Sequence, residues 1–316
     1  MDSFPPYELL DPWAERAATE TKKLERLYHN TRSYAWDPRD VLSELEKKHG
    51  GIHLSPDKRE AIGHVFTVLL WGELAAWNIA TELARSLPDL DARMAATGQA
   101  FDEARHFTVL RDYLTRAGVD VPRMNPFGRR VLKKILETDS MLEKLYGMQL
   151  TVENLALALF KRLSASNVEP VLTDLLEYIE RDESRHVAFG VIYVPKLLAK
   201  STAYERAKNW AFNIELFGYT VAGGQFMDPY LETLGVDHRE LGLSVMKLHQ
   251  QVIRQMAEEA GLKQGEHVRG VYGLTTKQHM LLVDTLHPAG KRMSTTHRVA
   301  LGAFDKAVRT TAAWLH

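Results

Sequence analysis

Cysteine is absent from this 316-residue chain. Its absence excludes disulfides, thiolate zinc sites, iron–sulfur clusters and cysteine nucleophiles. Any bound metal ion must therefore be held by carboxylates, imidazoles and water, a ligand set that suits iron, manganese or zinc.

The chain also lacks an excess of charge and a long apolar run. It has 40 Lys and Arg residues against 41 Asp and Glu residues, so nothing suggests nucleic acid or an anionic membrane as a partner. The apolar run near 65–71 is too short to span a bilayer. The opening MDSFPPYELLDPW has no apolar core of the kind that a signal peptide needs. We therefore expect a cytoplasmic protein with no nucleic-acid or membrane partner.

Strand-like alternation is scarce, and helical patterns dominate. Ser55 and Pro56 predict a helix start, because a capping hydroxyl is followed by proline at the first helical position. This pattern continues to Pro88. A second helix is predicted from about 91 to 118, before a break at 118–128.

Capping-box pairs predict where two later helices begin. Ser140 with Glu143 precedes a third helix to about 163, and Ser166 with Glu169 precedes a fourth helix to about 200. Further helices are expected at 129–137, 202–226, 238–261, 274–286 and 294–315. No linker rich in Gly, Ser or Pro separates a second domain. The expected organisation is a single all-α domain over 1–316, comprising an N-terminal extension at 1–54, a four-helix core at 55–200 and additional helices at 201–316.

One pattern occurs twice. Residues 102–106 read DEARH and residues 182–186 read DESRH, so each places a Glu and a His on one helix face. Another Glu stands 30 residues before each of these, at Glu73 and Glu153. The differences 153 − 73, 183 − 103 and 186 − 106 are all 80, so the chain contains E-x29-E-x-x-H twice.

The spacing has a geometric meaning. Two residues face each other across an antiparallel helix pair when the turn lies midway between them, and the midpoints here are 88 and 168. Each acid then lies about 13 residues from its turn, or roughly 20 Å along a helix. All four acids would lie at one level of a four-helix bundle. The link at about 118–139 is long enough to recross the bundle, which predicts a crossover topology.

Four acids and two imidazoles in apolar surroundings predict a metal centre. Unpaired carboxylates in a core would cost many kcal/mol or shift their pKa values upward, whereas two divalent cations would neutralise them. One Glu on each of two helices, with Glu-x-x-His on each of the other two, is the ligand set of di-iron carboxylate bundles. The predicted metal ligands are Glu73, Glu103, His106, Glu153, Glu183 and His186.

Charged residues flank both motifs. Asp102 and Asp182 precede the motif Glu, and Arg105 and Arg185 precede the His. Metal-bound His usually donates its other N–H to a carboxylate. The two Asp residues could accept that bond, on the same helix or across to the other hairpin, and the Arg residues could pair with them. The alternative is that all four are surface charges.

A third Glu-x-x-His, from Glu46 to His49, lies in a charged stretch that ends in Gly50 and Gly51. It has no Glu 30 residues earlier. We therefore interpret it as a solvated helix end, since a lone motif of this kind is weak evidence.

The doubled DExRH pattern resembles the ferritin-like, carboxylate-bridged di-iron superfamily. This group includes ribonucleotide reductase small subunits, acyl-carrier desaturases, bacterial monooxygenase hydroxylases and arylamine N-oxygenases. The similarity covers about 36–200, and WDPRD at 36–40 is similar to the reductase-like branch. It implies a ferritin-like four-helix bundle with a long crossover, in which two iron ions or a manganese–iron pair react with dioxygen. It also implies an external electron donor, and a homodimer is compatible with it.

Three positions depart from particular branches of this superfamily. Leu110 stands where the reductases carry a radical tyrosine, and Ile179 stands where the N-oxygenases carry a seventh, histidine ligand. Leu157 replaces the Thr that hydroxylases place one turn after the third-helix Glu. No single branch therefore fits this chain.

Our leading functional hypothesis is a dioxygen-activating non-heme di-iron oxidoreductase, a monooxygenase or oxidase, acting on a small, largely apolar organic substrate. The helices beyond the four-helix core would form walls around a substrate cavity. The alternatives are a ferroxidase or iron- and peroxide-handling protein, an R2-like manganese/iron oxidase, and an interaction protein that keeps its ligands only for stability.

Overall fold

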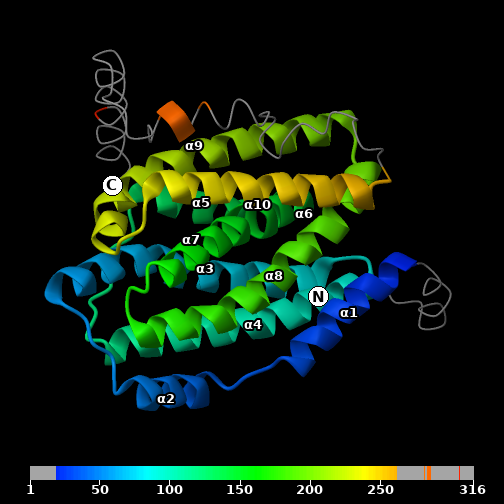
Figure 1. Ribbon diagram of the computed structural model, residues 1–316. Helices are drawn as coiled ribbons and strands as arrows, with labels where there is room; N and C mark the ends of the chain where they lie inside the picture. The colour runs from blue at the N-terminus through cyan, green and yellow to red at the C-terminus, as the bar shows by residue number, and fades with distance from the viewer. Residues whose placement is uncertain (1–18, 262–280, 282, 286–305, 307–316) are drawn as a thin grey trace.

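The computed structural model describes residues 19–261, 281, 283–285 and 306, and within them the chain forms helices and no strand (Figure 1). The elements are α1 (Thr19–Ser33), α2 (Pro38–His49), α3 (Pro56–Ser86), α4 (Leu90–Arg116), α5 (Pro126–Glu137), α6 (Met141–Leu145), the π-helix η2 (Tyr146–Val152), α7 (Glu153–Ala165), α8 (Pro170–Lys200), α9 (Ala203–Thr233) and α10 (His238–Glu259). The helices predicted at 274–286 and 294–315 lie almost entirely outside the described residues.

The two predicted hairpins are present. The turn between α3 and α4 surrounds Pro88, and the turn between α7 and α8 surrounds residue 168, as the midpoint argument requires. Helix α3 packs on α4, α7 packs on α8, and α4 contacts α8. The link between the hairpins contains α5. The prediction of an all-α bundle with a crossover connection is therefore confirmed for the described residues.

Two further layers cover the bundle on opposite sides (Figure 1). Helices α1 and α2, from the predicted N-terminal extension, contact α4 and α8. Helices α9 and α10 lie over the other side, where α9 contacts α3 and α10 contacts α7 and α8. The N-terminal helices thus cover the side that carries the DExRH motifs, and the C-terminal helices cover the side that carries Glu73 and Glu153.

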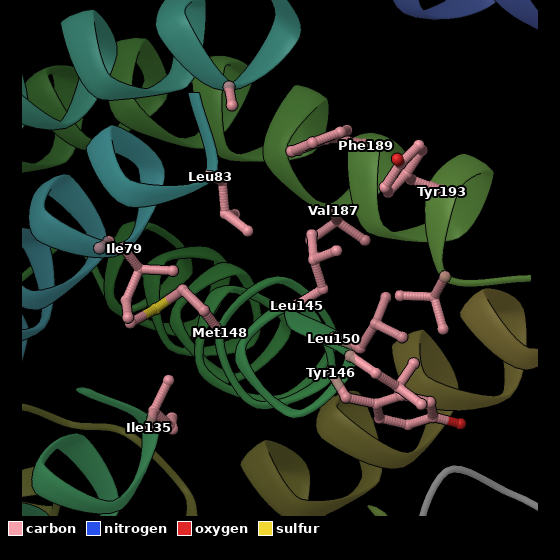
Figure 2. Packing of buried hydrophobic residues seen from close by; sticks show 14 of the residues in the cluster. Ile79, Leu83, Ile135, Leu145, Tyr146, Met148, Leu150, Val187, Phe189 and Tyr193 are labelled. Carbon is pink, nitrogen blue, oxygen red and sulfur yellow. The ribbon is translucent and has the colours of Figure 1, made fainter. Parts of the chain in front are cut away.

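The apolar core is divided into two clusters along the bundle axis. On α3, one cluster includes buried residues from Ala61 to Leu70 and the other includes those from Ala75 to Leu83. On α8, the first cluster ends at Ile179 and the second begins at Val187, so residues 180–186 separate the two clusters. Figure 2 shows part of the second cluster, with labelled residues from α3, α5, α6, η2 and α8. The acidic residues therefore lie in a layer between two apolar regions.

Two predicted capping boxes are wrong in detail. Ser166 ends α7, and Glu169 is itself the N-cap of α8, where its carboxylate accepts from the Leu172 N–H. The reason is Pro170, which holds the preceding residue in an extended conformation, so the helix cannot begin earlier. Ser140 does cap α6, but the carboxylate of Glu143 accepts from the Thr138 hydroxyl instead of returning to the cap.

The third bundle helix is not uniform. It passes through the π-helix η2 immediately before Glu153, a feature that the helical pattern did not predict. Such segments are frequent at functional sites because they change the direction in which side chains project. Helix α9 also continues to Thr233, past the predicted end at 226, and contains Pro229.

Helix α3 is the one described helix that is long and apolar enough to cross a membrane. However, 67% of its most apolar window is buried inside the molecule. It also carries the buried Glu73 into the polar layer. These features are those of a core helix in a folded bundle.

Candidate metal centre

The six predicted metal ligands converge in the interior of the bundle. Their exposed fractions lie between 0% and 5%, and they come from four different helices. One group of ligand atoms, all within 4.8 Å of one another, comes from Glu73, Glu103, His106 and Glu183. A second such group comes from Glu103, Glu153, Glu183 and His186. Glu103 and Glu183 belong to both groups, so the arrangement offers two adjacent cation positions that share two carboxylates.

The imidazoles and carboxylates alternate at short range. His106 Nδ1 lies 3.0 Å from Glu183 Oε1 and 3.3 Å from Glu73 Oε2. His186 Nδ1 lies 3.0 Å from both Glu103 Oε1 and Glu183 Oε2. The Nδ1 atoms of both rings therefore point toward the shared carboxylates.

The other nitrogen of each ring contacts an aspartate from the opposite hairpin. His106 Nε2 lies 3.3 Å from Asp182 Oδ2, and His186 Nε2 lies 3.3 Å from Asp102 Oδ2. Of the two arrangements that the sequence left open, the structure contains the one that crosses between hairpins. Each Asp thereby orients the ring that the other motif supplies.

The two arginines complete a buried ionic network. Arg105 pairs with Asp102 and lies 3.1 Å from Asp182, and Arg185 lies 2.9 Å from Asp102 and 2.7 Å from Asp182. Both Asp residues are fully buried and the Arg residues are 6% and 9% exposed. The alternative of surface charges is therefore wrong. The guanidiniums balance the two aspartates, which leaves the four glutamates to be neutralised by other cations.

Sequence reasoning missed the contribution of the N-terminal extension. The Trp36 indole N–H donates to Asp182 Oδ2 at 2.8 Å, and its ring stacks near His106 at 6.3 Å between centroids. Thr31 donates to Asp102. The sequence indicated only a family resemblance for WDPRD and no role for Trp36, because nothing in the spacing of Trp36 relates it to residue 182. Gln99, which donates to Glu103 and Glu153, and Gln149, which donates to Gln99, were missed as well.

The third Glu-x-x-His has a separate environment at the end of α2. Glu46 pairs with Arg116, and His49 Nε2 lies 2.7 Å from Asp174. Gly50 ends the helix with a positive φ of 75°. The interpretation as a helix end is confirmed, because these are ion pairs at the molecular surface.

A family model described as "Ferritin-like domain, actinomycetes" matches residues 56–224, more than half of the chain. The chain belongs to this ferritin-like family. The predicted membership of the ferritin-like superfamily is thereby confirmed. No curated protein matches the chain.

Solved structures of oxidases share the ferritin-like fold of this chain. A Synechococcus protein described as having aldehyde deformylating oxidase activity is 19% identical, with a TM-score of 0.56 and coverage of 72% of this chain and 97% of that one. An R2-like ligand-binding oxidase with an aerobically reconstituted metal cofactor is 18% identical, with a TM-score of 0.54 and coverage of 76% and 93%. A variant of that oxidase carries a Mn/Fe cofactor. At these identities the similarity shows the fold alone.

Between the ferritin-like bundle and the C-terminal helices lies a cavity that reaches the centre. The cavity has a volume of about 270 Å³ and lies between α3, α7, α9 and α10. Glu73 and Glu153 form part of its wall, and most of the rest is apolar, including Leu69, Ala156 and Val245. Its volume is near the lower end of the roughly 300–1,000 Å³ typical of small-molecule sites.

Burial and mutual contact shift the pKa values of the central groups. Burial raises the pKa of Glu73 and Glu153 well above the ordinary value, and the charge of Glu183 adds to that effect. Burial also acts upward on Glu183, but His186 together with hydrogen bonds to Glu153 and His106 outweighs it and holds the pKa of Glu183 well below its usual range. Burial opposes charging of both imidazoles, yet the surrounding carboxylates raise the pKa of His106 and His186 well above the ordinary value.

The donor set fits two divalent cations. In the described part of the chain, buried Glu103 Oε2 has no hydrogen-bond partner, and buried Glu183 Oε1 lies 3.0 Å from His106 Nδ1 without the geometry of a hydrogen bond. Both oxygens belong to residues shared by the two groups. A buried carboxylate oxygen without a donor is costly unless a cation meets it. Oxygen and imidazole donors in this number suit iron or manganese.

The raised imidazole pKa values predict a pH dependence. In the metal-free protein His106 and His186 hold protons, and a metal ion must displace them, so metal affinity is expected to rise with pH and loading should release protons. Without metal, the stability that these protonated rings contribute is complete below about pH 6.5 and is lost as pH rises through their higher folded-state pKa values.

This expectation is checked in two ways. Proton release on Co²⁺ addition can be measured with an indicator dye in weak buffer, and melting temperatures of metal-free and loaded protein can be compared as pH rises above about 6.5. The gap between the two melting temperatures should widen with pH. Metal affinity that does not change with pH would contradict protonated imidazoles in the metal-free centre.

Proposed function

We propose that this ferritin-like protein is a dioxygen-activating, non-heme dimetal oxidoreductase that oxidises a small, largely apolar organic substrate. The observation that carries the proposal is the apolar cavity, because it ends at Glu73 and Glu153 of the buried six-residue centre. Such a cavity suits an organic molecule better than a bare metal ion, because most of its wall is apolar. The oxidase activities named for the structures of similar fold support the same reaction class.

The six residues would hold two iron ions or a manganese–iron pair, which supply redox chemistry with dioxygen when bound. The surrounding side chains prepare that site. Asp102 and Asp182 orient the two imidazoles, and Arg105 and Arg185 balance the aspartate charges. The two apolar clusters above and below the acids exclude water from this layer.

Substrate and electrons would approach from opposite sides. The cavity lies under α9 and α10, on the side of Glu73 and Glu153. Trp36, which is partly exposed, lies on the side of α1 and α2 and is connected by Asp182 to His106. We propose that an external electron donor acts at the Trp36 side, so that a reductant need not enter the cavity.

The proposal is tested by loading the protein anaerobically with Fe²⁺, and then adding dioxygen and a reductant with or without short aliphatic alkanes, alcohols and aldehydes. We expect dioxygen uptake that rises with an aliphatic compound and yields an oxidised organic product. Iron oxidation that proceeds without organic product for every compound would favour a ferroxidase. Loaded protein that does not react with dioxygen would favour a structural role for the metal.

Gly72 provides a test of the cavity. This residue is buried, precedes Glu73 and lines the cavity, and a Cβ built on it meets no atom within 4 Å. A Gly72→Leu side chain should therefore occupy cavity space. We expect unchanged metal content and a loss of about 10-fold or more in kcat/KM for the bulkiest accepted substrate, as for other changes of pocket size.

The matched control is Gly218→Leu. Gly218 lies on α9, is exposed, and also has no atom within 4 Å of a built Cβ, but it does not line the cavity. Both changes should raise helix propensity equally. Equal activity of the two variants on substrates of every size would show that the space beside Gly72 is not used.

A further inference from the structure

The two cation positions have different neighbours although the ligand positions of the two hairpins are matched. At the offset of 80 residues, Gln99 corresponds to Ile179, and Gln149 corresponds to Leu69. Each of these residues stands one helical turn before one of the four central glutamates. One half of the centre therefore has two amides where the other half has two aliphatic side chains.

The amides form a continuous hydrogen-bonded line to the acids. Gln149 Nε2 donates to Gln99 Oε1 at 3.1 Å. Gln99 Nε2 in turn donates to Glu153 Oε1 at 3.1 Å and to Glu103 Oε1 at 3.0 Å. Both Gln residues are almost completely buried. Water therefore competes little for these bonds, and each amide restricts the orientation of the next group.

The opposite half offers no equivalent restraint. Leu69 and Ile179 are buried in the apolar cluster at that end of the bundle. Among the described residues, the hydrogen-bond partner of the Glu73 carboxylate is His106, a ligand of the same centre. Glu153 is thus held by a residue outside the ligand set, and Glu73 is not.

The π-helix and a glycine accommodate this line of amides. Gln149 lies within η2, the segment that departs from α-helical geometry just before Glu153. A Cβ built on Gly190 of α8 would lie 2.8 Å from Gln149 Cβ. A side chain at 190 would therefore collide with Gln149, and glycine leaves Gln149 where it donates to Gln99.

We infer that Gln99 and Gln149 are positioning residues that make the two cation positions unequal. They hold Glu153 in place for the position formed by Glu103, Glu153, Glu183 and His186, so that position binds its cation more tightly than the one containing Glu73. This inference rests on the proposed dimetal function. Partners beyond the ligands of a metal site commonly change its affinity by about 10–100-fold.

The test is an anaerobic Co²⁺ titration followed by visible absorption. Wild-type protein should bind two Co²⁺ in two separate steps. Gln99→Met and Gln149→Met preserve side-chain length but remove the amides, and each should weaken the tighter step by about 10–100-fold. The weaker step should change much less, because the amides reach that position only through the shared Glu103. A His186→Ala variant identifies which step belongs to the Glu153 position, since it removes a ligand of that position alone.

Leu69→Met is the matched control, because it makes a similar change at the equivalent position of the other half. It should leave the tighter step unchanged. The melting temperature of each metal-free variant checks that the bundle still folds. If Gln99→Met and Gln149→Met bound Co²⁺ with the affinities of the wild-type protein, or if both binding steps weakened equally, the inference alone would be overturned. Wild-type protein that binds fewer than two Co²⁺ would overturn the proposed function together with it.

Discussion

Replacing Glu103 with alanine is expected to leave less than about one metal ion per chain under conditions that load the wild-type protein, because dimetal carboxylate sites depend on their shared acids. Glu103 belongs to both ligand groups and contacts the imidazole of His186 at 3.0 Å. Its removal takes a donor from each position at once. Metal content per chain after anaerobic Fe²⁺ loading and desalting measures the effect.

Glu73→Ala is the contrasting variant. Glu73 belongs to one group only, so its removal should leave about one ion per chain, bound at the other position. A Glu46→Ala variant, altered at the surface Glu-x-x-His, should retain the full content. If Glu103→Ala kept as much metal as Glu46→Ala, the shared-ligand arrangement would be wrong.

Asp182→Ala is expected to destabilise the metal-free protein by about 3–5 kcal/mol, the cost of removing one partner from a buried ionic network. Asp182 is fully buried and contacts Arg105, Arg185, His106 and Trp36. Without its carboxylate, two guanidiniums share the single charge of Asp102. The free energy of unfolding from urea denaturation of metal-free protein provides the measurement.

The control for this variant is Asp174→Ala. Asp174 makes pairs of similar length with Lys48 and His49, but it lies at the surface, with 24% of its side chain exposed. Exposed pairs contribute about 0–1 kcal/mol because water screens them. A loss of stability no greater for Asp182→Ala than for Asp174→Ala would show that the buried network does not stabilise the fold.

The sequence was sufficient to predict the geometry of the bundle centre. Equal spacing of the acids around Pro88 and around residue 168 placed both turns correctly. Spacing succeeds here because α-helices are rigid and have a fixed rise, so residues equidistant from a turn come to the same level. The same reasoning brought His106 and His186 together, with 5.8 Å between their ring centroids.

Features that depend on contacts between distant segments could not be predicted in this way. The indole of Trp36 reaches Asp182 across 146 positions of sequence, and no periodicity links the two. The π-helix η2 was also missed, because its residues are compatible with an α-helix and no local motif marks the departure. The error in the N-cap of α8 has a local cause. Pro170 disfavours helical geometry at Glu169, so the sequence itself argued against the Ser166–Glu169 capping box.

Several expectations stay predictions. The assignment of 1–316 to one domain is one of them, since much of the chain beyond residue 261 lies outside the described residues. The electron donor, the homodimer and the cytoplasmic location are others. For the apolar cavity, the sequence predicted only that helices after residue 200 would form its walls. The observed cavity is bounded in part by α9 and α10, which agrees with that prediction.

Anomalous X-ray diffraction from crystals of the wild-type protein loaded with Mn²⁺ or Fe²⁺ would locate the cations most directly. We predict two peaks in the polar layer between α3, α4, α7 and α8, one beside His106 and one beside His186, with Glu103 and Glu183 contacting both. Peaks confined to the molecular surface, or an interior with no peak after loading, would contradict a dimetal centre in this bundle.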